Sequence, residues 1–69
     1  MRNFEELYNK IIGSEKFIKK GNHIYRVRES KIHKFTIADL YLLLSDRFNI
    51  DDTILASKLY IHMLKNIKK

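Results

Sequence analysis

The stretch KFIKKGNHIYRVR, residues 16–28, decides the fold of this chain because it has the pattern of a β-hairpin. Residues 16–20 and 23–28 are predicted to be its two strands, in which successive side chains point to opposite faces. Between them, Gly21-Asn22 forms a two-residue loop with glycine first, which favours a type II′ turn. This loop predicts the following cross-strand pairs: Lys20 with His23, Lys19 with Ile24, Ile18 with Tyr25, and Phe17 with Arg26.

The same alternation assigns the residues of the hairpin to two faces. We expect Ile18, Tyr25 and Val27 to share the face that packs against the core. The opposite face should then be basic and exposed, and it consists of Phe17, Lys19, Ile24, Arg26 and Arg28.

The hairpin and the segment just after it also hold the net charge of the chain. Residues 16–34 contain seven Lys or Arg residues and a single acid, Glu29, which gives this segment a net charge of +6. The whole chain also has a net charge of +6, so the remainder is neutral. A basic ribbon on a neutral body indicates an anionic partner.

Helical patterns lie on both sides of the hairpin. Before it, Phe4–Ile12 has apolar residues at helical spacing, with Asn3 in position to cap the helix and Gly13 to end it as the C′ residue. After it, Lys31–Phe35 forms either a short third strand or a plain connection.

Two more helices follow that connection. Thr36 and Asp39 have the spacing of a capping box, which predicts a helix beginning after Thr36. Asp51 or Asp52 begins a last helix that extends to about Asn66. The sequence thus predicts a single small α+β domain over residues 1–69, in the order helix, β-hairpin, helix, helix. It has a helical core and a basic antiparallel sheet of two or three strands.

Length and composition narrow the class of protein. The core of a 69-residue domain is small, and without cysteine no disulfide or thiolate metal site supports it, so self-association is a common remedy. The longest apolar run, residues 40–44, is too short to span a bilayer, and no secretory signal is visible. We expect a cytoplasmic protein with no membrane contact, located in the host cytoplasm if a phage encodes it.

The chemistry of the basic segment suggests what it binds. Lys and Arg neutralise phosphates, and aromatic rings stack on unpaired bases, so we expect a nucleic acid (DNA or RNA) or an acidic protein as the partner. Phe17 should contact bases or sugars. The candidate binding residues are Lys16, Phe17, Lys19, Lys20, Arg26, Arg28, Lys31 and Lys34.

The last helix carries a second candidate surface. Ile54 and Ile61 fall outside its predicted apolar stripe and lie seven residues apart, which is typical of a partner-contact seam. We expect this face to support a homodimer or to contact another partner, through Ile54, Lys58, Ile61 and Lys65.

Other functional classes are disfavoured. His23, His33 and His62 have no metal-site spacing, and His62 is expected on the helix surface, so no metal or cofactor is predicted. No convergent nucleophile and base can be recognised, so we expect no enzyme.

The acids at Asp51-Asp52 would repel a DNA backbone, and residues 46–51 are long for a tight turn, which disfavours a helix-turn-helix.

The preferred interpretation is a small, basic, non-catalytic nucleic-acid-binding protein with an accessory or regulatory role. The alternative is a protein-interaction module or inhibitor that presents the same hairpin to an acidic partner protein. The order of elements matches neither a winged helix, in which the hairpin comes last, nor a ribbon-helix-helix, in which the strand comes first. The composition, rich in Lys and Ile, is similar to that of accessory proteins of phages and mobile elements.

Overall fold

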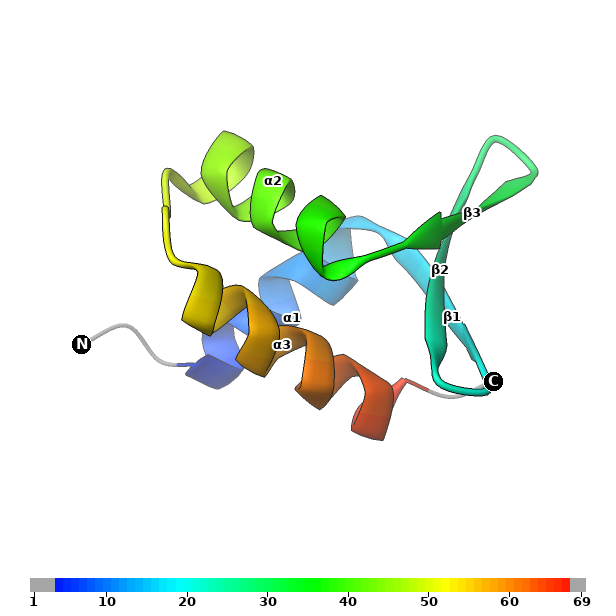
Figure 1. The fold of residues 1–69 in the computed structure, drawn as a ribbon. Coiled ribbons are helices and arrows are strands. Elements are labelled where there is room, and N and C mark those ends of the chain that lie inside the picture. The colour runs from blue at the N-terminus through cyan, green and yellow to red at the C-terminus, as the bar shows by residue number, and fades with distance from the viewer. Residues whose placement is uncertain (1–3, 68–69) are drawn as a thin grey trace.

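A computed structural model describes residues 4–67 and contains three helices and a three-stranded antiparallel sheet (Figure 1). The predicted α+β order of helix, β-hairpin, helix and helix is confirmed, and residues 31–35 do form a third strand. The predicted cap Asn3 lies outside the described residues. The elements are α1 (Phe4–Ser14), β1 (Lys16–Lys20), β2 (His23–Arg28), β3 (Lys31–Phe35), α2 (Ile37–Phe48) and α3 (Thr53–Asn66).

The sheet has β2 at its centre, between β1 and β3. The predicted register of β1 and β2 is confirmed at every pair from Phe17–Arg26 to Lys20–His23. Gly21 has a φ of +60°, and Asn22 is not among the residues with positive φ, which fits the predicted type II′ turn. The second hairpin turns through Glu29 and Ser30, whose φ angles of +49° and +67° are those of a type I′ turn made without glycine.

The ends of the helices follow the local sequence with one exception. Thr36 and Asp39 form the predicted capping box of α2. Of the two residues predicted to cap α3, Asp52 is its N-cap. The Asp52 side chain accepts hydrogen bonds from the backbone N–H groups of Ile54 and Leu55. The prediction that Gly13 ends the first helix is wrong, because the helix continues to Ser14 without a left-handed residue at Gly13.

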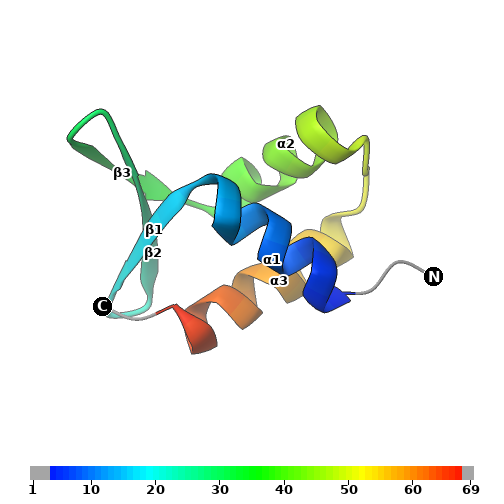
Figure 2. The ribbon, with the colours of Figure 1, turned by 180° about the vertical axis from the view of Figure 1, so that it is seen from behind.

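The three helices form a body that lies on one side of the sheet (Figures 1 and 2). None of the helices in the described part of the chain is long and apolar enough to cross a membrane. The buried core draws on all three helices and on both β2 and β3, and its members are Leu7, Tyr8, Ile11, Ile24, Phe35, Leu40, Leu43, Leu44, Ala56, Leu59 and Met63.

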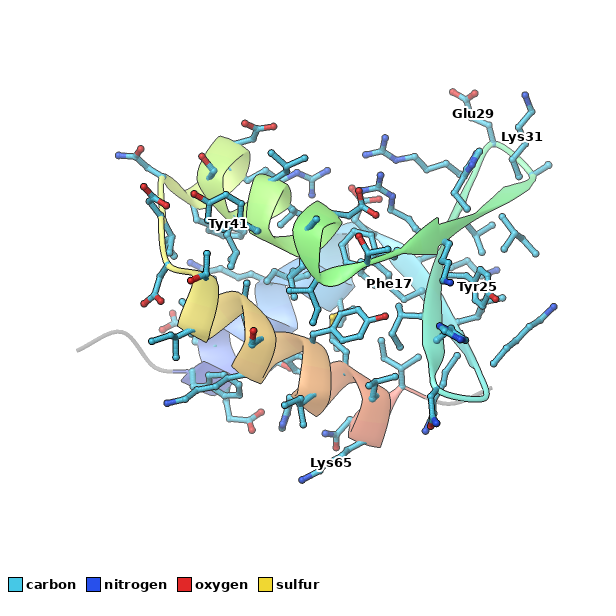
Figure 3. All side chains as sticks on the ribbon, viewed as in Figure 1. Phe17, Tyr25, Glu29, Lys31, Tyr41 and Lys65 are labelled. Carbon is cyan, nitrogen blue, oxygen red and sulfur yellow. The ribbon has the colours of Figure 1, made fainter. Side chains whose placement is uncertain are left out.

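The sheet presents the opposite face to this core from the one predicted. Ile24 and Phe35 lie opposite each other on β2 and β3, and both are almost fully buried. The Phe17 ring packs on the Phe35 ring, with centroids 5.0 Å apart. Tyr25 points away from the helices (Figure 3). The predicted core face is therefore wrong, and the face predicted to be exposed is the inner one.

Two basic side chains make this inner face possible. Lys19 buries its aliphatic stem and donates a hydrogen bond from Nζ to the carbonyl oxygen of Leu64, at 2.6 Å near the end of α3. The Arg26 guanidinium lies over the Phe35 ring, 5.2 Å from its centroid. Long side chains with charged ends can thus occupy a core-facing row, which the polarity pattern alone does not reveal.

Candidate nucleic-acid interface

The outer face of the sheet is the surface of the strands that the helices leave uncovered (Figure 1). Because side chains alternate along each strand, the register places every second residue on this face. We define the outer face by its residues: Lys16, Ile18, Lys20, His23, Tyr25, Val27, Ile32 and Lys34.

Tyr25 occupies the centre of the outer face. It lies on the middle strand, directly between Ile18 on β1 and Lys34 on β3. Ile18, Tyr25 and Val27 are each half-buried, although no described helix covers them. The middle of the face is therefore an apolar and aromatic platform.

Exposed lysines surround this platform. Lys20 and Lys16 lie at the two ends of β1, and Lys34 lies beside Tyr25 on β3. None of the three strands contains an acidic residue. The outer face therefore combines ammonium groups, which attract anions, with a flat ring that can stack on another flat group.

The inner face carries a different arrangement, built around one carboxylate. The Glu15 side chain is only 6% exposed, and its Oε2 lies 3.1 Å from Nη2 of Arg28. The same oxygen also accepts a hydrogen bond from Arg47 of α2, whose second nitrogen donates to the hydroxyl of Ser14. Glu15 thus ties β2 to the end of α2.

The environment of Glu15 changes its acidity. Burial by itself favours the neutral carboxyl group and would raise the pKa. The hydrogen bonds and positive charges of Arg28 and Arg47 outweigh this effect, so the pKa of Glu15 lies below its ordinary value of 4.5. The group is therefore a carboxylate at neutral pH.

A groove of about 290 Å³ lies between this part of the sheet and α2. Acidic and basic side chains both contribute to it, and Glu15 already holds Arg28 and Arg47. The groove therefore lacks the one-sided charge of the outer face. Its lining residues are Arg26, Arg28, Asp39, Leu42, Leu43, Asp46 and Arg47.

The structure divides the predicted binding residues between the two faces. It brings Lys16, Lys20 and Lys34 together on the outer face. It places Arg28 and Lys31 opposite each other on the inner side, beside the Glu29-Ser30 turn. The remaining predicted residues, Phe17, Lys19 and Arg26, have the inner contacts described above.

Sequence reasoning missed Tyr25 as the surface aromatic residue and assigned that part to Phe17. A signal was available, because a two-residue turn at Glu29-Ser30 pairs Ile24 with Phe35. Phe35 immediately precedes the α2 cap, where an apolar residue packs against the helix. Had β3 been taken as a strand, Ile24 and Phe35 would have identified the core face.

The second candidate surface lies on α3. Ile54 and Ile61 are 68% and 52% exposed, and Lys58 and Lys65 are also exposed at matching helical spacing. We call these four residues the α3 seam.

His62, next to the seam, differs from its prediction as a helix-surface residue. Its ring packs edge-on against Phe4 and Tyr8, with centroid distances of 5.2 and 4.4 Å. Its Nε2 lies 3.4 Å from the Glu5 carboxylate. This histidine therefore helps to hold α3 against α1. Within residues 4–67, no group of three or more His, Asp or Glu side chains could hold a metal ion.

Comparison of the chain with models of known protein families, with curated proteins and with solved structures gives no match in any of the three.

Proposed function

We propose that this protein is a non-catalytic nucleic-acid-binding protein that makes its contacts through the outer face of the sheet. One observation carries the proposal: Tyr25 lies on an apolar platform that is bordered by Lys16, Lys20 and Lys34. An accessory or regulatory role fits a binder of this size.

The lysines and the Tyr25 ring of the outer face suit different parts of a nucleic acid. Each lysine that neutralises a phosphate releases a condensed counterion, which favours binding without requiring a particular sequence. An exposed aromatic ring stacks on bases, all of which have a flat π-face. The Tyr25 ring and its lysines therefore suit a polymer in which phosphates and flat rings alternate.

An acidic protein is the alternative partner for the lysines, in which case the chain is an interaction module or inhibitor. Acidic side chains satisfy the ammonium groups equally well. They do not stack on the aromatic and aliphatic centre of the outer face as bases do, which is why a nucleic acid is the preferred partner.

A second copy of the chain is proposed as the partner of the α3 seam. Two isoleucines that are both more than half exposed lie on one helix face, and burying them against another copy would remove apolar surface from water. A two-fold interface would let the same seam serve both copies.

The test of the nucleic-acid proposal is a salt series with one set of matched variants. Three engaged lysines predict that log K falls against log[salt] with a slope of about −2 for a single strand, or about −3 for a duplex. The combined substitution Lys16→Gln, Lys20→Gln and Lys34→Gln should abolish most of this slope. The matched control removes the same charge elsewhere, through Lys10→Gln, Lys58→Gln and Lys65→Gln.

With a short strand that one copy of the protein can occupy, the control triple variant should bind much as the parent does, because Lys10 lies on α1 and Lys58 and Lys65 lie on α3, away from the outer face. Equal weakening by both triple variants would mean that only the overall charge matters, and it would overturn the assignment to the outer face. Binding of an acidic protein without any affinity for nucleic acid would favour the alternative.

A further inference from the structure

We infer that the outer face binds single-stranded nucleic acid in preference to duplex, with a base stacked on Tyr25; this rests on the proposed function. This preference follows from which side chains the outer face contains, and from where the fold places the arginines.

The centre of the outer face has few groups that could read a duplex. Base edges in a groove are read by the amide or guanidinium groups of Asn, Gln and Arg, which form paired hydrogen bonds, and by Lys, which on the outer face lies only at the border. None of the residues that define the outer face is Asn, Gln or Arg. Its centre is made by Ile18, Tyr25 and Val27, whose side chains offer a groove one hydroxyl group, that of Tyr25.

Both arginines of the sheet make their contacts on the inner face. Arg26 lies over the Phe35 ring, and Arg28 binds the nearly buried Glu15. Both groups therefore support the fold on the inner face. The arginines of the sheet thus lie on the opposite side of the sheet from the outer face.

The same apolar centre suits unpaired bases. In a duplex the bases are stacked on each other and expose only their edges, whereas a single strand can present its base faces to a platform. The Tyr25 ring and the flanking aliphatic groups would then cover a base. Lys16 and Lys20, about 14 Å apart along β1, would contact phosphates on the same strand.

The tyrosine content of the chain provides a direct signal for this contact. The chain has four tyrosines and no tryptophan, so its intrinsic fluorescence comes from tyrosine. Tyr8 is buried, and the hydroxyl groups of Tyr41 and Tyr60 donate hydrogen bonds to Asp51 and to the Phe35 carbonyl. Stacking of a base on Tyr25 should therefore quench the emission of this tyrosine.

The experiment measures affinity and tyrosine emission with a mixed-sequence DNA strand and with the same strand annealed to its complement. We expect the single strand to bind more tightly and to quench the emission. Tyr25→Leu keeps an apolar side chain but removes the stacking ring, and it should weaken single-strand binding by about five- to one-hundred-fold. Tyr25→Phe should keep the affinity and lose the quenching, whereas Tyr41→Phe should keep both.

Two outcomes would overturn the inference in distinguishable ways. Equal affinity for strand and duplex, with Tyr25→Leu harmless and the outer-face lysines still required, would reject the single-strand inference and leave the proposed function intact. Absence of binding to both forms by a folded protein would reject the inference and the proposed function together.

Discussion

At the scale of single residues, Glu15 shows how one buried carboxylate organises a small fold. It precedes β1, yet it binds Arg28 on β2 and Arg47 on α2, which is 32 residues away in the chain. Hydrogen bonds to a charged group contribute about 1.5–3 kcal/mol each when they are sheltered. Both arginines are partly exposed, which reduces this contribution through solvent screening.

We expect Glu15→Gln to lower the free energy of unfolding by about 1–2 kcal/mol at neutral pH. The pKa of Glu15 is lower in the folded state than in the unfolded state, so the carboxylate stabilises the fold above its ordinary value of 4.5. That stabilisation is lost as the pH falls through the folded pKa. Denaturant unfolding of the parent and the variant from pH 7 to pH 3 should show their difference shrinking.

The control for this measurement is Glu29→Gln, in the exposed turn between β2 and β3. Its effect on unfolding should be small at every pH. A difference between the parent and Glu15→Gln that stays constant down to pH 3 would contradict the assigned role of the Glu15 carboxylate.

At the scale of elements, the local patterns predicted the helices, the first hairpin and its register, since caps, tight turns and periodicity depend on neighbouring residues. They did not predict which face of the sheet is buried. Both faces contain large apolar or aromatic residues, Ile18, Tyr25 and Val27 on one and Phe17 and Ile24 on the other, so alternation alone supports either choice. The pairing of Ile24 with Phe35 decides which face is buried, and the sequence alone does not establish that residues 31–35 form a strand.

The prediction of the binding residues also depended on which face of the sheet was taken to be buried. The lysines were identified because charge is visible in the sequence, and three of them do border the outer face. Phe17 was predicted on the exposed face and Tyr25 on the core face, whereas in the structure Phe17 packs on Phe35 and Tyr25 points away from the helices. Arg47 was missed because its contact with Glu15 joins distant parts of the chain and leaves no local pattern.

The two glycines should respond in opposite ways to the same substitution. A Cβ at Gly13 or at Gly21 would meet no atom within 4 Å, so only the backbone conformation distinguishes them. Gly13→Ala lies within α1 and should raise the free energy of unfolding by about 0.5–1 kcal/mol. Gly21→Ala must adopt a φ of +60° and should lower it by about 1 kcal/mol.

Denaturant unfolding of the two alanine variants checks this prediction, each variant serving as the control for the other. Because the inner face holds Phe17 and Ile24, any slip of the hairpin caused by Gly21→Ala would also expose apolar surface. Equal effects of the same sign would mean that the turn does not depend on the left-handed conformation of Gly21.

At the scale of the whole molecule, the two candidate surfaces point in different directions. Tyr25 projects from the sheet away from the helices, whereas Lys65 of the α3 seam projects from α3, downward in the view of Figure 3. A partner on the seam would therefore leave the outer face accessible. Two copies joined through α3 would present two outer faces, which increases the effective affinity for a long strand.

We expect the parent protein to dimerise through the α3 seam and Ile61→Glu to be monomeric, because the substitution places a charge where apolar surface must be buried. Ile32→Glu is a matched control, since Ile32 on the outer face is 53% exposed and Ile61 is 52% exposed. Sedimentation at high micromolar concentration should show a dimer for the parent and for Ile32→Glu. A monomeric parent would rule out the seam as a self-association surface. The same two variants separate the surfaces by function, because Ile32→Glu should weaken binding of a short single strand while Ile61→Glu leaves it unchanged.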